Sequence, residues 1–162
     1  MLLDGEIRSQ QVSIRSELAE ELPPVRANRA QLQQVVVNLI MNAVEAMSTV
    51  ANHARSLRVK TEMQESDYLL ITVEDSGTGI DAENINRIFD AFYTTKSYGT
   101  GMGLSICRSI VDDVGLDFWA ETRAGHRAAA VVAAASILRI LMLGAPFSGD
   151  RQRRRRLWSA AA

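Results

Sequence analysis

Two asparagines and a glutamate share one face of a predicted helix, and an asparagine side chain there offers a neutral oxygen that can bind a cation. Residues 29–47 repeat apolar side chains at helical spacing after Asn28, a residue type that favours the position before a helix. On the other side of this helix Asn38, Asn42 and Glu45 fall at i, i+4 and i+7. An amide oxygen can ligate Mg²⁺ without adding negative charge beside phosphate groups. The solvent-facing side of an amphipathic helix explains the same stripe, so the pattern alone leaves both interpretations open.

Two glycine-containing segments have the residue types that nucleotide and phosphate binding require. Asp75-Ser-Gly-Thr-Gly-Ile80 follows a predicted strand, and a carboxylate there can accept a hydrogen bond from an exocyclic amine. Gly77 and Gly79 allow a flat base to approach the backbone, although a simple turn explains the same residues. Residues 99–104, GTGMGL, open another predicted helix, whose first N–H groups can bind an anion. No strand directly precedes them, so they form neither a Walker A loop nor a dinucleotide fingerprint.

The elements around these segments predict a two-layer α/β sandwich, with a mixed sheet covered by helices on one face. Alternating or β-branched apolar residues indicate the strands, and apolar residues at helical spacing indicate the helices. Asp81 is in a position to cap a short helix that ends at Ile88. Strands are expected at residues 11–17, 57–62, 68–74 and 118–122, and helices at residues 29–47, 82–88 and about 104–114.

Composition is that of an ordinary globular protein. The chain has 162 residues, of which 47% are hydrophobic and 23% charged, enough for one domain with a sizeable core. No apolar run approaches the roughly 18 residues that cross a bilayer, and the first residues lack a secretory signal pattern. Cys107 is the single cysteine, which excludes an internal disulfide and fits a small buried side chain in a reducing compartment. We therefore expect a cytoplasmic domain without a membrane segment.

Four segments occur in one order along the chain: NLIMNAVEAM, VEDSGTGI, IFDAFYTTK and GTGMGLSICRSIV. In that order they resemble the N, first glycine, F and second glycine boxes of sensor histidine kinases, relatives of the gyrase, heat-shock chaperone and mismatch-repair ATPases. The TTK triplet and short lid are similar to the nitrogen- and oxygen-sensing type. The resemblance covers about residues 10–122. It implies an ATP-dependent protein-histidine kinase module that uses ATP and Mg²⁺. The expected partner is a separate dimerisation domain that carries the acceptor histidine, with a response regulator as indirect partner.

The resemblance also assigns roles to individual residues. Asn42 is expected to ligate Mg²⁺, with Asn38 as a second polar contact near the phosphates. Asp75 is expected to accept a hydrogen bond from the adenine amino group. Lys96 is expected to contact phosphate, although a solvated lid lysine is the alternative, and Phe89 is expected with Phe92 to anchor the lid. The other nucleotide-binding residues are Gly77, Gly79 and Ile80 near the adenine, and Gly99, Gly101, Gly103 and Leu104 around the triphosphate.

Asn38 separates kinase chemistry from hydrolysis. The related ATPases carry a glutamate four residues before the magnesium asparagine, where it activates a water molecule. An amide cannot act as a general base near pH 7, so the γ-phosphate is expected to be kept for transfer. A non-catalytic or degenerate ATP-binding module, or an ATPase of the same fold, are the alternatives, and Asn38 argues against the ATPase.

The chain departs from the family pattern at three places. His53 and His126 both lie outside an acceptor-helix motif, and both are expected to be solvated. Residues 114–116, VGL, stand where the family has His-Gly-Gly. After Thr122 the family has a G-x-G-T-x-F strand, whereas residues 125–132 read GHRAAAVV. Backbone pairing by the alanine-rich segment up to residue 135 can still close the sheet, at a cost in stability, because alanine is a poor strand former.

The charge is divided unevenly along the chain. Residues 123–162 hold eight arginines and one aspartate, a net charge of +7, which leaves −8 for residues 1–122 within a total of −1. We therefore divide the chain into an ATP-binding catalytic domain, residues 1–135, and a divergent basic tail, residues 136–162, expected to be partly disordered. The arginine run has no nucleic-acid-binding signature beside it, so no nucleic-acid partner is expected.

Overall fold

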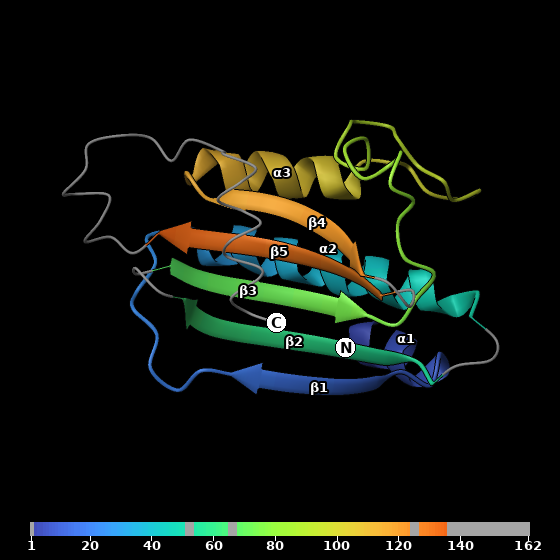
Figure 1. Cartoon of the computed structure of the whole chain (residues 1–162), viewed down its shortest axis with the longest axis horizontal. Coiled ribbons are helices and arrows are strands. Elements are labelled where there is room, and N and C mark those ends of the chain that lie inside the picture. Colours follow the sequence, from blue (N-terminus) through green and yellow to red (C-terminus); the bar gives the residue numbers. More distant parts are fainter. Residues whose placement is uncertain (1, 51–53, 65–67, 124–126, 136–162) are drawn as a thin grey trace.

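The structure, a computed structural model, describes residues 2–50, 54–64, 68–123 and 127–135. These residues form the predicted two-layer α/β sandwich, with a mixed sheet in one layer and helices over one of its faces (Figure 1). In chain order the elements are α1 (Leu2–Ser9), β1 (Ser13–Leu18), α2 (Arg29–Ser48), β2 (Ser56–Gln64), β3 (Tyr68–Asp75), α3 (Gly103–Asp113), β4 (Asp117–Arg123) and β5 (Arg127–Ala135). His53, His126 and the tail at 136–162 lie outside the described residues.

The strands are ordered β1-β2-β3-β5-β4. β1 pairs with β2 in parallel, and the other three pairs are antiparallel. The prediction that the alanine-rich segment pairs as a strand is confirmed, because Ala130 lies opposite Val73 of β3 and Ala120 of β4. Its place differs from that of a closing edge strand: β5 lies between β3 and β4, and β4 forms the edge. The β4–β5 pair folds back so that β4 lies beside α3, which precedes it in the chain (Figure 1).

The core lies between α2, α3 and the sheet. The Asn28 side chain caps α2 as predicted, with its Oδ1 accepting from the N–H groups of Ala30, at 2.9 Å, and Gln31, at 3.3 Å. From this start, apolar residues at helical spacing bring one face of α2 against the sheet and α3. The buried cluster comprises Val12, Val35, Leu39, Ala43, Val44, Met47, Leu57, Val73, Cys107, Ile110, Val111 and Phe118.

Two short segments differ from the sequence prediction. Helix α1 was not predicted: it has only eight residues and contains Gly5, a poor helix former. Its Ile7 packs partly on the core. The short helix predicted up to Ile88 was wrong. The segment instead forms consecutive turns, in which Asp81 O accepts from the N–H groups of both Asn84 and Ile85. This mixture of three- and four-residue spacing does not continue as a regular helix.

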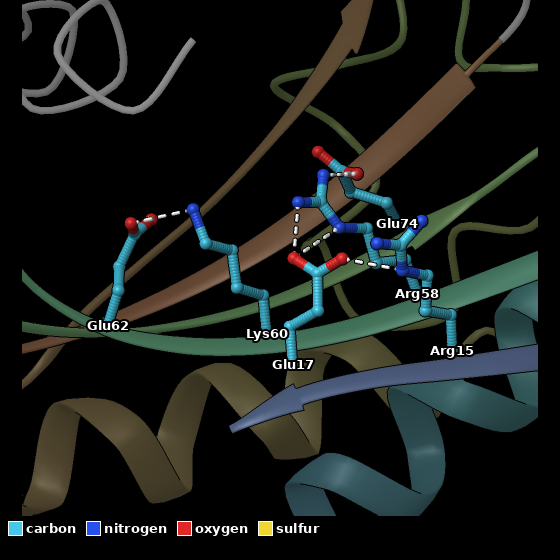
Figure 2. A network of polar contacts seen from close by, with 6 residues as sticks. All are labelled: Arg15, Glu17, Arg58, Lys60, Glu62 and Glu74. Atoms are coloured by element: carbon cyan, nitrogen blue, oxygen red, sulfur yellow. Dashed lines mark hydrogen bonds and ion pairs between the residues drawn. The ribbon is translucent and has the colours of Figure 1, made fainter. Parts of the chain in front are cut away.

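Charged side chains pair across the sheet face that points away from the helices (Figure 2). Glu17 of β1 contacts Arg15 at 2.7 Å and Arg58 of β2 at 2.5 Å, and Arg58 also reaches Glu74 of β3. The hydrogen bond from Arg58 lowers the pKa of Glu17 below its ordinary value. These pairs are partly exposed to solvent, so each adds little stability.

Candidate functional site

A buried carboxylate lies where β3 ends and the first glycine segment begins. Asp75 is only 7% exposed, and its Oδ1 accepts a hydrogen bond from the Gly77 N–H at 2.8 Å. A Cβ on Gly77 would lie 2.7 Å from that Oδ1 and 2.9 Å from the carbonyl carbon of Ala46 on α2. Glycine is therefore required for this loop to pack directly on the helix. Burial raises the pKa of Asp75 to about 6, while the Gly77 N–H and the charge of Lys96 act in the opposite direction.

The rest of the first glycine segment is hydrogen-bonded to β4, the edge strand of the sheet. Gly79 has a φ of 77°, a conformation that glycine adopts without strain. The Thr122 Oγ1 on β4 accepts from the Ile80 N–H at 2.8 Å and donates to the Ile80 carbonyl at 3.0 Å. This supporting role of Thr122 was not predicted from the sequence. The available signal was its alternation with Phe118, which points the threonine to the helix-covered side of β4.

Asn42, Lys96 and the start of α3 come together near the first glycine segment. The Lys96 Nζ donates to the Asn42 Oδ1 at 3.3 Å and forms an ion pair with the Glu45 carboxylate. On the other side, a Cβ on Gly103 would lie 4.0 Å from the Asn42 Nδ2. The lid, residues 89–102, thus converges at Asn42 with the polar side of α2 and the N-terminus of α3. Glu45 belongs to this group, although it was not among the site residues predicted from the sequence.

These donors fit a magnesium ion held mainly by phosphates and water. Within the described ranges no three histidine, cysteine, aspartate or glutamate side chains gather as a metal cluster. The oxygens of Asn42 and Glu45 nevertheless already accept one cation, the ammonium group of Lys96. Mg²⁺ in nucleotide sites is bound through one or two protein oxygens together with phosphates and waters. Asn42 would hold it here, with Glu45 beside it.

Asn38 lies one turn before Asn42 and contacts the middle of α3. Its Nδ2 donates to the Cys107 Sγ at 3.5 Å. Cys107 is fully buried, which confirms the prediction of a small core side chain, and burial raises the pKa of its thiol. The structure therefore places the Asn38 amide against α3, one turn below the group that surrounds Lys96.

The lid loop is closed on itself by backbone contacts between its two ends. The Phe92 N–H donates to the Gly101 carbonyl at 3.0 Å, and a Cβ on Gly101, whose φ is 68°, would lie 2.4 Å from the Phe92 carbonyl carbon. A Cβ on Gly99 would lie 2.5 Å from the Thr94 Oγ1. Larger residues at these two glycines would therefore open the loop. Leu104, predicted to contact the triphosphate, is half-buried and packs on the core.

Aromatic contacts attach the lid to the body of the domain. The Phe89 ring meets Phe118 of β4 edge-on, with centroids 4.8 Å apart, and the Arg108 guanidinium lies 4.2 Å above Phe89. The predicted anchoring role of Phe89 is confirmed. The same prediction was wrong for the Phe92 side chain, which is 75% exposed and joins the lid through its backbone.

The altered third glycine region keeps a glycine where the backbone needs one. Gly115 follows α3 with a φ of 70°, and its N–H donates to the Asp112 carbonyl. The Leu116 N–H donates to the Val111 carbonyl at 3.0 Å and completes the helix end. Replacing His-Gly-Gly by VGL therefore preserves the turn that directs the chain into β4.

Comparison with known proteins identifies the family of this domain. Residues 27–135 match the family described as histidine kinase-, DNA gyrase B-, and HSP90-like ATPase. The chain belongs to this family. It is 40% identical over 123 residues to the sensor histidine kinase TmoS of Ectopseudomonas mendocina. The matched region covers 75% of this chain and 13% of TmoS. It is 41% identical over 117 residues to the sensor protein FixL of Bradyrhizobium diazoefficiens, which covers 72% of the chain and 23% of FixL.

Solved structures place the chain more closely within the family. The catalytic domain of histidine kinase ThkA superposes with a TM-score of 0.71 at 32% identity, covering 83% of this chain and 86% of that one. The chain is therefore a histidine kinase catalytic domain of the α/β sandwich type. It spans less than a quarter of the length of the two curated relatives. Within its described residues no helix has both the length and the apolar character to cross a membrane.

Proposed function

We propose that this domain binds ATP with Mg²⁺ and transfers the γ-phosphoryl group to a histidine on a separate dimerisation domain. The observation that carries the proposal is the arrangement along α2. The Asp75–Gly77 loop packs at Ala46, and the Lys96 contact is at Asn42, one helical turn earlier. A buried acceptor for an adenine amine and a cation position beside a helix N-terminus thus lie on one side of one helix. One nucleotide can use both.

The residues of the chain have separate tasks in this proposal. Asp75 accepts from the adenine amino group, beside Gly77, Gly79 and Ile80. The N–H groups at Gly99, Gly101 and Gly103, together with Lys96, bind the phosphates. Asn42 holds the metal, which when bound neutralises charge on the phosphate oxygens. The acceptor's neutral imidazole nitrogen attacks the γ-phosphorus in line, so the domain needs to supply no general base.

Partners of the relatives support the signalling context. One solved relative is described as histidine kinase ThkA in complex with the response regulator protein TrrA. We infer a response regulator downstream of this domain too, reached through the phosphorylated histidine. The nitrogen- or oxygen-sensing subtype and a cytoplasmic location belong to the same proposal, supported by the TTK triplet, the likeness to FixL and the free buried thiol of Cys107. The family match that ends at residue 135 supports a catalytic unit over residues 1–135.

Two alternatives predict different products. A non-catalytic module would bind ATP and release it unchanged, whereas an ATPase would release free phosphate. Asn38 argues against the ATPase, because its side chain is an amide that contacts Cys107 and no carboxylate occupies this turn of α2 to activate a water. Incubation with γ-labelled ATP and a separate dimerisation domain tests all three. Label on the acceptor histidine supports the proposal, and label found only in free phosphate or only in ATP contradicts it.

A further inference from the structure

Lys96 connects the lid to α2 through its side chain while its backbone shapes the lid. Its Nζ bonds both to the Asn42 Oδ1 and to the Glu45 carboxylate. Its N–H donates to the Thr94 Oγ1 at 3.1 Å, and its carbonyl accepts from the Gly99 N–H at 3.4 Å. Releasing the ammonium group would therefore remove the side-chain contact between α2 and the segment from Thr94 to Gly99, which contains the first glycine of the phosphate-binding segment.

The two oxygens that hold Lys96 lie on one face of α2. Asn42 and Glu45 are three residues apart, so their side chains are neighbours, and a single ammonium group contacts both. Asn42 is also the residue that the family resemblance assigns to the metal. An ammonium group and a magnesium ion cannot occupy the same position, because both are cations and both need these oxygens.

From this shared position, and resting on the proposed function, we propose that Glu45 is a positioning residue. Glu45 holds Lys96 on α2 while no nucleotide is bound. When ATP binds with magnesium, Lys96 leaves the two oxygens and turns to the phosphates. Glu45 thereby makes ATP binding depend more strongly on Mg²⁺, since without the metal its carboxylate both retains Lys96 and repels the phosphates.

Calorimetric titration of the full chain with ATP, once with excess Mg²⁺ and once with EDTA, tests this dependence. Glu45→Gln removes the charge and keeps the shape of the side chain. We expect it to tighten metal-free ATP binding about two- to fivefold, the range of an exposed ion pair, and to reduce the Mg²⁺ benefit by at least that factor. Glu62→Gln is the matched control, because Glu62 forms a similar ion pair with Lys60 on the sheet face away from the helices (Figure 2). An unchanged ratio of the two affinities in Glu45→Gln would overturn the proposal.

A double variant separates positioning from simple repulsion. In a Lys96→Gln background, Glu45→Gln should change metal-free ATP binding much less than it does in the parent chain, because there is no ammonium group to release. An equal effect in both backgrounds would mean that the carboxylate only repels phosphate and does not act through Lys96.

Hydrogen exchange of the nucleotide-free chain gives a readout that does not depend on ATP. Glu45→Gln should speed exchange of the Lys96 and Gly99 amides about two- to fivefold, whereas Glu62→Gln should leave them unchanged. Unchanged exchange with intact ATP binding overturns this inference alone. A parent chain that binds no ATP overturns the proposed function, and faster lid exchange in Glu45→Gln would then still report the Lys96 contact.

Discussion

Asp75 combines burial with a free hydrogen-bonding capacity. One of its oxygens is used by the Gly77 N–H, and the side chain is 7% exposed. A buried carboxylate with acceptor sites to spare is suited to a ligand that brings a donor. Gly77 makes this possible, because any larger residue would separate the loop from Ala46.

Asp75→Ala should weaken ATP binding by about 1–3 kcal/mol, because the adenine amine would enter the pocket without a partner. Titration calorimetry with excess Mg²⁺ measures the loss. Glu74→Ala, at the preceding residue on the opposite sheet face, is the control and should bind ATP as the parent does. ATP binding by Asp75→Ala that equals the parent would remove Asp75 from the nucleotide pocket.

The pKa of Asp75, raised to about 6 by burial, predicts a pH dependence. Above this pKa the side chain is a carboxylate and accepts strongly, whereas below it protonation weakens the acceptor. ATP affinity should therefore fall as the pH drops through about 6. The ratio of parent to Asp75→Asn affinity cancels the titration of ATP itself. A ratio that stays constant between about pH 5 and 7 would contradict this role.

The raised pKa of Asp75 affects the stability of the fold in the direction opposite to its effect on ATP affinity. A carboxyl whose pKa is higher in the folded than in the unfolded chain favours the folded state most when it is protonated. Its contribution is fully present below the ordinary value of 3.8 and is lost as the pH rises through about 6. Charge on Asp75 thus opposes folding at neutral pH, where the proposed ATP binding would use that charge.

At the scale of elements, the lid depends on one aromatic anchor. Phe89→Ala removes the contact with Phe118 and the ring beneath Arg108. We expect a loss of about 1–3 kcal/mol in the free energy of unfolding by urea, below the roughly 3–5 kcal/mol of a fully buried phenylalanine. Phe92→Ala, in the same lid but 75% exposed, should stay within about 0.5 kcal/mol. Equal losses in the two variants would show that Phe89 is not the anchor.

Elements with a strong local signal were predicted well, and those set by tertiary contacts were not. Helix α2 was predicted to within one residue because Asn28 caps it and its apolar stripe is long. The turns after Asp81 follow a residue type that often caps helices and contain apolar residues like those of a helix, but their backbone hydrogen bonds mix three- and four-residue spacing. The central place of β5 depends on how β4 and β5 fold back together, which the sequence of either strand does not contain.

The sequence motifs predict separate residues of the candidate site but not the contacts between those residues. Asp75, Asn42 and the glycines follow from their motifs. The ion pair of Lys96 with Glu45 joins residues 51 apart in the chain, and the bond of Thr122 with Ile80 spans 42. Periodicity reports neighbours within one element, so such pairs become visible only once α2, the lid and β4 are in place.

In the whole molecule, we expect the basic tail at residues 136–162 to contribute little to the domain that precedes it. The family match and strand β5 both end at residue 135. We therefore expect deletion of residues 145–162 to leave ATP affinity and the thermal midpoint of unfolding essentially unchanged. Calorimetric titration and thermal unfolding of the shortened chain measure the two quantities. A large loss in either would show that the tail is part of the folded domain.

The central claim, transfer of phosphate to an acceptor histidine, is tested most directly by a single turnover. The full chain, in excess over γ-labelled ATP, is mixed with a separate dimerisation domain in Mg²⁺, and acceptor labelling and free phosphate are followed together. We expect acid-labile label on the acceptor before free phosphate accumulates, and loss of this label in Asn42→Ala or with EDTA. Free phosphate that appears first, or ATP that is bound and recovered intact, would contradict it.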